Sequence, residues 1–200
     1  MTKKKIILLG ATGSVGVQAL DVIAAHPDQF ELVGFAFGKN IEKAREIIQA
    51  FSPKIVVASQ ESSQIELAQE FPSVEIHVGA EGLITLAQLE AYDILLNAIV
   101  GSVGLPPTIE AVKLGRDIAL ANKETLVVAG YTIMAEAART GSKILPVDSE
   151  HAAIFQVLQG VQKSDVRSLT ITASGGSFRD QTREELLDVT LDDALAHPNW

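Results

Sequence analysis

The stretch Lys5-Ile6-Ile7-Leu8-Leu9-Gly10-Ala11-Thr12-Gly13-Ser14-Val15-Gly16 joins an apolar run to three glycines spaced three residues apart. Each glycine has its own use in a turn that holds a pyrophosphate. The first allows a tight turn, the second lets the backbone approach the phosphates, and the third lets a helix pack closely on a sheet. The amides of Ser14 and Val15, at the start of the next helix, would face the anion. An ordinary tight strand-to-helix turn is the alternative, but the position on the first strand of the chain favours dinucleotide binding.

Beyond this loop, short apolar runs alternate with longer segments in which apolar residues have helical spacing. The expected strands are Lys5–Leu9, Glu31–Ala36, Lys54–Ala58, Glu75–Val78, Ile94–Asn97, Asp117–Leu120 and Lys143–Val147. The expected helices are Ser14–His26, Ile41–Phe51, Gln60–Glu70, Leu83–Glu90, Pro107–Leu114 and Glu124–Arg139. Nearly all-apolar strands are typical of parallel sheets covered on both faces. The pattern predicts an α/β fold, a doubly wound parallel sheet of the Rossmann type.

After Val147 the pattern changes to a helix over 150–160, a strand over 168–172, a glycine-rich loop and a weakly apolar acidic stretch. We therefore predict a Rossmann domain over 1–146 and the start of a second, α+β catalytic domain over 147–200. The last residues, HPNW, close no element, so we expect that the chain is truncated relative to a longer protein.

Composition excludes several classes of function. The chain has 16 basic and 25 acidic side chains, a net charge of −9, and no cysteine. The acidic balance argues against nucleic-acid binding, which needs clustered Lys and Arg. The missing cysteine removes disulfides, thiolate metal sites and thiol nucleophiles. With no membrane-length apolar run and no signal or transit peptide, we expect a cytoplasmic protein without a membrane partner.

The end of the second expected strand indicates which dinucleotide is bound. NAD-selective proteins place an acidic residue there to hold the ribose diol. This chain instead has Gly38, Lys39 and Asn40. A lysine and an amide suit the 2′-phosphate of NADP, although a solvated loop lysine is the plain alternative.

Two further polar clusters follow expected strands. Asn122, Lys123 and Glu124 come after a strand at the ligand-binding edge, but Asn122 could also cap the next helix. Asp148 and Glu150, in the segment PVDSEH, would share a face of an extended backbone and could bind a divalent cation. Capping of the following helix by Asp148 or Ser149 is the alternative.

A last cluster, around Ser174, is a glycine turn flanked by hydroxyl groups. Such a turn suits a phosphate or a sugar hydroxyl, or is a plain turn.

Together, GATGSVG, GKN, LANKE, PVDSEH, TASGGSFR and HPNW resemble the 1-deoxy-D-xylulose-5-phosphate reductoisomerase family over essentially the whole chain. The resemblance implies an NADPH-dependent and Mg²⁺- or Mn²⁺-dependent enzyme that forms 2-C-methyl-D-erythritol 4-phosphate in non-mevalonate isoprenoid synthesis. It implies a sugar-phosphate substrate and a homodimer at full length. This chain is similar to the N-terminal half of such proteins, so we expect it to bind NADPH but to be inactive alone.

Matching motifs assign roles to individual residues. The NADPH contacts implied by the resemblance are Thr12, Gly13, Ser14, Val15, Gly38, Lys39, Asn40, Asn122 and Glu124. The implied substrate contacts are Lys123, Ser149, Glu150, Ser174 and His197, and the implied metal ligands are Asp148 and Glu150. Lys123, Asp148 and Glu150 are the expected catalytic residues.

Two alternatives from other classes stay open. A homoserine-dehydrogenase-like oxidoreductase also combines a Rossmann domain with a catalytic lysine and no cysteine. A non-catalytic dinucleotide-sensing domain would need only the glycine loop. Neither would need the two carboxylates of PVDSEH, so metal dependence separates them from the reductoisomerase.

Overall fold

The computed structural model describes residues 2–172 and 176–196 and divides the chain into two compact units, 1–148 and 149–200. The first unit contains a seven-stranded sheet in the order β4-β3-β2-β1-β5-β6-β7, with every paired strand parallel. Its strands are β1 (Lys4–Leu9), β2 (Phe30–Phe37), β3 (Ile55–Ala58), β4 (Glu75–Val78), β5 (Ile94–Asn97), β6 (Asp117–Leu120) and β7 (Ile144–Pro146). The prediction of a doubly wound parallel sheet is confirmed.

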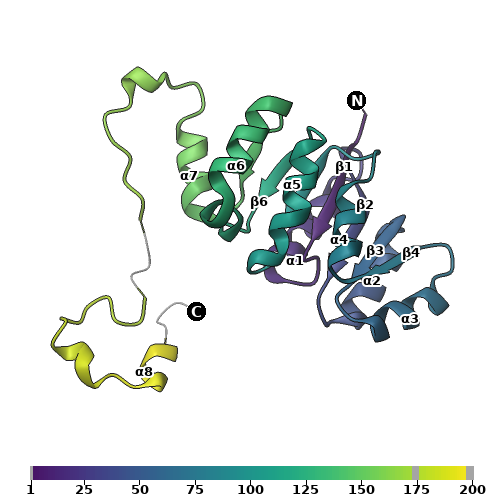
Figure 1. The fold of residues 1–200 in the computed structure, drawn as a ribbon, viewed down its shortest axis with the longest axis horizontal. Coiled ribbons are helices and arrows are strands. Elements are labelled where there is room, and N and C mark those ends of the chain that lie inside the picture. Colours follow the sequence, from purple (N-terminus) through teal and green to yellow (C-terminus); the bar gives the residue numbers. More distant parts are fainter. Residues whose placement is uncertain (1, 173–175, 197–200) are drawn as a thin grey trace. The chain divides into compact units, whose positions relative to one another are not determined.

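Helices connect the strands (Figure 1). In the first unit they are α1 (Ser14–Ala25), α2 (Ile41–Phe51), α3 (Glu61–Glu70), α4 (Gly79–Ala87), α5 (Leu105–Lys113) and α6 (Glu124–Thr140), with a 3₁₀ turn, η1 (Ser102–Gly104), before α5. None of the helices in the described ranges is long and apolar enough to cross a membrane.

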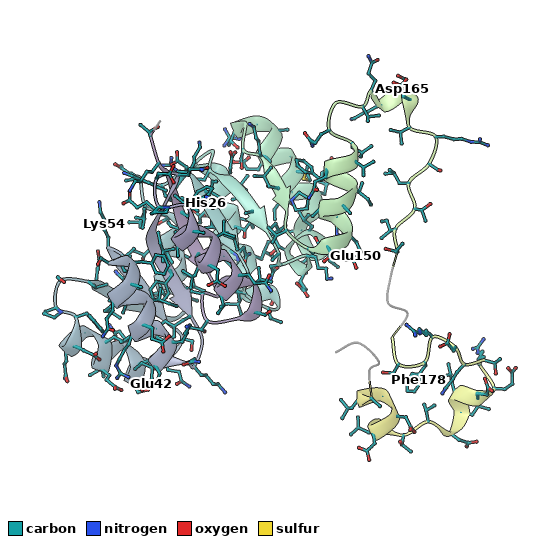
Figure 2. All side chains as sticks on the ribbon, turned by 180° about the vertical axis from the view of Figure 1, so that it is seen from behind. His26, Glu42, Lys54, Glu150, Asp165 and Phe178 are labelled. Atoms are coloured by element: carbon teal, nitrogen blue, oxygen red, sulfur yellow. The ribbon has the colours of Figure 1, made fainter. Side chains whose placement is uncertain are left out.

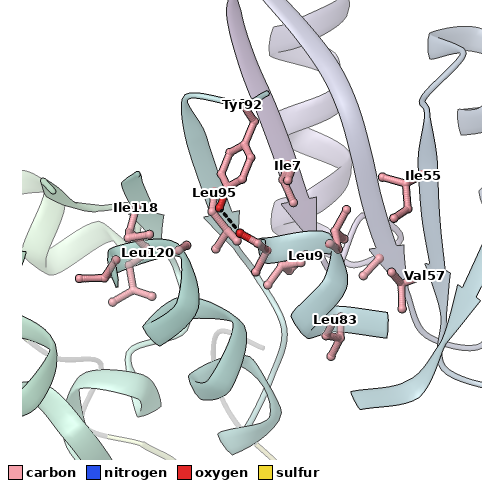
Figure 3. Close-up of a cluster of buried hydrophobic side chains, with 14 of the residues drawn as sticks. Ile7, Leu9, Ile55, Val57, Leu83, Tyr92, Leu95, Ile118 and Leu120 are labelled. Atoms are coloured by element: carbon pink, nitrogen blue, oxygen red, sulfur yellow. Dashed lines mark hydrogen bonds between the residues drawn. The ribbon is translucent and has the colours of Figure 1, made fainter. Parts of the chain in front are cut away.

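Each face of the sheet is buried by its own set of helices. On β1, Ile7 and Leu9 join a core cluster that also contains side chains from α4, α5 and α6 (Figure 3). Ile6 and Leu8 alternate with them and join a second cluster with side chains of α1, α2 and α3. Both faces of β1 are therefore buried, which explains why its sequence is continuously apolar rather than alternating.

Two helices of the first unit begin earlier than their sequence pattern predicted. Helix α4 starts at Gly79 rather than Leu83, and its glycines concealed the helical spacing. Gly82 lies so close to the sheet that a Cβ there would be 2.9 Å from Val57 Cγ1. Helix α5 starts at Leu105 rather than Pro107, because prolines are tolerated in a first turn, where no amide partner is needed.

The second unit is described by itself. It contains α7 (Ser149–Val157), the 3₁₀ turns η2 (Lys163–Asp165) and η3 (Glu185–Asp188), and α8 (Leu191–Leu195). The predicted strand over 168–172 is wrong: these residues are exposed and carry no strand. Leu169 and Ile171 alternate with polar residues as in a strand, but a strand needs a hydrogen-bonded neighbour, and none is present in the described ranges.

Gly34 provides a test of how tightly the sheet is packed. A Cβ at Gly34 would lie 2.6 Å from Ile55 Cγ2 and 2.8 Å from Leu86 Cδ1, whereas one at Gly38 would meet nothing within 4 Å. We expect Gly34→Ala to lower the free energy of unfolding by about 1–3 kcal/mol through overpacking. Gly38→Ala is the matched control and should change it by less than about 0.5 kcal/mol. Urea denaturation of both variants measures this, and equal effects would contradict the packing argument.

Candidate functional site

The carboxyl ends of the parallel strands bring distant parts of the sequence to one edge of the sheet. Strand β1 runs into Gly10, β2 into Gly38, β3 into Ser59, β5 into Ala98 and β6 into Ala121. The strand order reverses beside β1, since β2 to β4 lie on one side of it and β5 to β7 on the other. Open α/β sheets bind ligands in the crevice at such a switch point.

Glycines allow the chain to turn sharply at this point. Gly10 has φ +85°, and its N–H, like that of Ala11, donates to the carbonyl oxygen of Ala36 at 2.9 Å. A Cβ on Gly10 would lie 2.7 Å from the Ala98 carbonyl oxygen. A Cβ on Gly16 would lie 2.2 Å from the Gly10 carbonyl oxygen. The first and third glycines of the motif therefore have the uses expected from the sequence.

The start of α1 is open to an anion. The residue before the helix is Gly13, which has no side chain that could cap the first amides. The first turn contains no acidic residue. The first amides of a helix lack intrahelical acceptors and carry partial positive charge. Gly13 and Ser14 are exposed, and Val15 is half-buried. This arrangement is suited to a phosphate group.

A cavity of about 410 Å³ adjoins the glycine loop. This volume lies within the range of about 300–1,000 Å³ that is typical of small-ligand sites. Its lining is uncharged and mostly apolar, and it comprises Gly10, Thr12, Gly13, Ala36, Phe37, Gly38, Val57, Ala58, Ser59, Gly79, Ala80, Leu83, Ala98, Ile99, Val100 and Val103. An apolar slot next to a phosphate-binding helix start is suited to the flat, uncharged ring of a nucleotide base.

Apart from Ser14 and Val15 at the start of α1, the predicted cofactor residues lie in three groups. Thr12, Gly13 and Gly38 line the cavity. Lys39 follows Gly38 directly and is exposed, so its ammonium group is available to a ligand phosphate. Asn40 is exposed too, and its Oδ1 accepts a hydrogen bond from the Lys43 N–H at 3.0 Å, so it caps α2.

The third group follows β6. Asn122 is buried, and its Oδ1 accepts hydrogen bonds from Thr125 N at 2.9 Å and Thr125 Oγ1 at 2.6 Å. This side chain therefore satisfies an amide in the first turn of α6, as the capping alternative predicted. Lys123 and Glu124 are exposed at the start of α6, and neither lines the cavity.

The geometry assumed for the metal ligands is wrong. Glu150 lies in the first turn of α7 rather than on extended backbone, because the helix already starts at Ser149. Asp148 is the last residue of the first unit and Glu150 belongs to the second, where Ser149 and Glu150 line a cavity of about 460 Å³. Across residues 2–172 and 176–196, no three His, Asp or Glu side chains gather as a metal site. Ser174 and His197 lie outside the described residues.

Sequence reasoning missed much of the cavity wall. Ser59, at the end of β3, donates a hydrogen bond from Oγ to the Gly38 carbonyl oxygen at 2.9 Å. Ala98, Ile99 and Val100 form another part of the wall after β5. The available signal was position alone: each follows a parallel strand at the ligand-binding edge.

Comparisons with known proteins agree with this geometry. The family described as 1-deoxy-D-xylulose 5-phosphate reductoisomerase matches residues 6–130, and the C-terminal domain of the same description matches residues 144–200. The chain is 55% identical over 199 residues to the 1-deoxy-D-xylulose 5-phosphate reductoisomerase of Bacillus subtilis. The match covers 98% of this chain and 52% of the relative, so the chain spans about half the length of such relatives.

Solved structures of reductoisomerases are also similar to this chain. The reductoisomerase from Zymomonas mobilis in complex with NADPH superposes with a TM-score of 0.91 at 35% identity, over 98% of this chain and 52% of that one. A reductoisomerase in complex with NADPH, fosmidomycin and magnesium gives 0.85 at 34% identity, with the same coverage. A homoserine dehydrogenase from Thiobacillus denitrificans gives 0.50 at 19% identity, over 76% of this chain and 30% of that one, and shares the fold alone.

Proposed function

The chain belongs to the 1-deoxy-D-xylulose 5-phosphate reductoisomerase family, and on that premise we propose that it supplies the NADPH-binding part of such an enzyme. The proposed overall reaction converts 1-deoxy-D-xylulose 5-phosphate to 2-C-methyl-D-erythritol 4-phosphate. One observation carries the proposal: the glycine loop opens α1 beside an uncharged cavity at the switch point of the sheet.

The first unit has the features that NADPH binding needs. The amides at the start of α1 would bind the pyrophosphate. Gly10 and Gly16 lie where the backbone of the loop is too closely packed for a Cβ atom. The adenine ring would enter the cavity between Gly38, Ser59 and Leu83. Lys39, exposed beside Gly38, would pair with the 2′-phosphate.

The substrate and metal ligands come from the family motifs. We propose that Asp148 and Glu150 provide carboxylate oxygens to Mg²⁺ or Mn²⁺, which are hard cations that prefer oxygen ligands. Lys123, Ser149, Ser174 and His197 would contact the sugar phosphate. When bound, NADPH supplies a hydride and the metal acts as a Lewis acid on the substrate carbonyl. Lys123, exposed at the start of α6, would add positive charge at the substrate oxygen.

The wider assignments rest on the family as well. We propose a cytoplasmic enzyme that is a homodimer at full length, binds no nucleic acid and acts on a small sugar phosphate. The relative solved with fosmidomycin, magnesium and NADPH supports a site in which metal and cofactor act together. A homoserine-dehydrogenase-like enzyme and a dinucleotide-sensing domain are the competing candidates, and neither requires a divalent metal.

Lys39 should decide the preference for NADPH over NADH. Losing a hydrogen bond to a charged group costs about 1.5–3 kcal/mol, so Lys39→Ala should weaken NADPH binding by roughly 10- to 150-fold. NADH binding should stay within about twofold. Lys54→Ala is the matched control, because Lys54 is exposed at the opposite, amino-terminal edge of the sheet, before β3 (Figure 2). Fluorescence titration of the wild type and both variants with NADPH and NADH measures the six affinities. Equal weakening of both cofactors by Lys39→Ala would show that Lys39 does not bind the 2′-phosphate.

The carboxylates should matter for turnover and not for cofactor affinity. In a protein of the relatives' full length, Asp148→Asn and Glu150→Gln should each lower kcat at least about 100-fold, because the charge that holds the Lewis acid is lost. The NADPH dissociation constant should stay within about twofold, since neither residue lines the first-unit cavity. Near-normal turnover of either variant would leave that residue with a capping role at α7.

The proposed function is tested most directly with the 200-residue chain itself. We expect it to bind NADPH, because the glycine loop, GKN and LANKE all lie in one compact unit. We expect no oxidation of NADPH when 1-deoxy-D-xylulose 5-phosphate and Mn²⁺ are added, because two carboxylates leave most of an octahedral shell unfilled. Failure to bind NADPH would contradict the proposal. Turnover within about tenfold of a full-length relative would contradict the expected inactivity.

A further inference from the structure

We propose that Asn97 is a positioning residue that holds the loop 98–101 against the cofactor cavity, together with Asn122 on the neighbouring strand end. The inference rests on the proposed NADPH site and deepens it. Asn97 was expected only as the last residue of a strand, and no role in a ligand site was expected for it.

Asn97 is fully buried at the end of β5, and its amide group bonds entirely to the segment that follows it. Its Nδ2 donates to the Gly104 carbonyl oxygen at 3.0 Å and to Thr108 Oγ1 at 2.9 Å. Its Oδ1 accepts from the Ile99 N–H at 3.2 Å. Thr108 Oγ1 itself donates to Gly104 at 2.7 Å, so its lone pair is available to Asn97. These partners fix the orientation of the amide, because a flipped amide would place donors against the Ile99 N–H.

Asn122 holds the same loop from the adjacent strand end. Its Nδ2 donates to the carbonyl oxygens of Ile99 and Gly101, the latter at 2.8 Å. Both of its donors are thus used, and its oxygen already accepts two hydrogen bonds from Thr125. The side chain has no donor left for a ligand. Ile99 is consequently held at its N–H by one asparagine and at its C=O by the other.

The two asparagines are also joined through the backbone. The carbonyl oxygen of Asn97 accepts from the N–H groups of Ala121 and Asn122, each at 3.0 Å. The ends of β5 and β6 are therefore linked where the sheet finishes, and the side-chain bonds extend that link into the loop. We call this set of bonds the asparagine clamp.

The clamped loop forms one wall of the cavity. Ala98, Ile99 and Val100 all line it, and Val100 is 88% exposed. On its other side the loop touches the glycine motif, since the Ala98 carbonyl oxygen occupies the space that a Cβ on Gly10 would need. A displaced loop would therefore disturb both the apolar wall and the phosphate turn.

The conformation of this loop can change the apparent affinity for NADPH, because only molecules with the loop in the binding-competent conformation bind the cofactor. When only a fraction of molecules has the competent loop, the apparent dissociation constant rises by the inverse of that fraction. Surface loops are mobile unless their backbone groups are held. The clamp holds three backbone groups of a four-residue loop, so it should keep that fraction near one.

The test compares Asn97→Ala and Thr108→Val with Tyr92→Phe in the 200-residue chain. Tyr92 is a matched control because it is buried and donates one hydrogen bond, from Oη to the Ala87 carbonyl oxygen at 2.7 Å (Figure 3). It precedes β5, at the amino-terminal edge of the sheet, and does not line the cavity. NADPH affinity is measured by fluorescence well below each Tm, and hydrogen–deuterium exchange is followed in peptides covering 98–101.

We expect Asn97→Ala to weaken NADPH at least about tenfold and to speed exchange in the loop. Thr108→Val should also weaken NADPH binding and speed exchange in the loop, but to a smaller degree. It is the deciding variant if Asn97→Ala does not fold. Tyr92→Phe should lower Tm but leave NADPH affinity within about twofold and loop exchange unchanged. Unchanged loop exchange, or faster exchange with unchanged affinity, would overturn the inference while wild-type binding sustains the proposed function. A wild-type chain that does not bind NADPH would overturn both.

Discussion

Gly10 has no Cβ atom, and this allows the ends of β1, β2 and β5 to come together around it. Its N–H donates to Ala36 at the end of β2, and its Cα faces the Ala98 carbonyl oxygen that follows β5. The chain turns there with φ +85° and enters α1. Three parts of the proposed cofactor site depend on this contact, because it fixes the helix start, the wall after β2 and the wall after β5 relative to one another. A methyl group at Gly10 would disturb all three at once.

The features that the sequence predicted well are those enforced by local chemistry. Strands buried on both faces must be apolar throughout, so runs such as Ile6–Leu9 were recognisable without a partner. The glycine spacing predicted the turn because its conformation excludes a side chain at Gly10 and Gly16. Features that depend on distant partners were harder to predict. Residues 168–172 have the alternation of a strand, but no neighbouring strand exists for them in the ranges that the structure describes.

Polar residues at strand ends show why a site cannot be assigned from residue type alone. Asn97 and Asn122 have the same side-chain chemistry; Asn97 is the last residue of β5, and Asn122 lies just after β6. The family resemblance implied that Asn122 contacts the cofactor, and nothing in the sequence gave a reason to consider Asn97. In the structure both amides bond to the chain's own backbone and hydroxyl groups. The distinction between a ligand contact and a group that holds a loop appears only when every donor and acceptor has been accounted for. The same holds for Glu150. Its residue type suggested a metal ligand on extended backbone, but it lies in α7 because that helix begins at Ser149.

The charge distribution of the site has a consequence for how NADPH would be selected. No residue that lines the cavity carries a charge, and the first turn of α1 contains no acidic residue. Binding of the base and pyrophosphate would therefore rest on apolar contact and backbone dipoles, which any adenine dinucleotide satisfies equally. Lys39 is the basic residue next to the cavity lining, directly after Gly38, and it is exposed. Discrimination between NADPH and NADH would thus be concentrated in one solvated side chain. The part of the affinity that NADPH and NADH share would instead depend on the glycine loop and on the wall held by the asparagine clamp, so selectivity and the shared affinity are set by different residues.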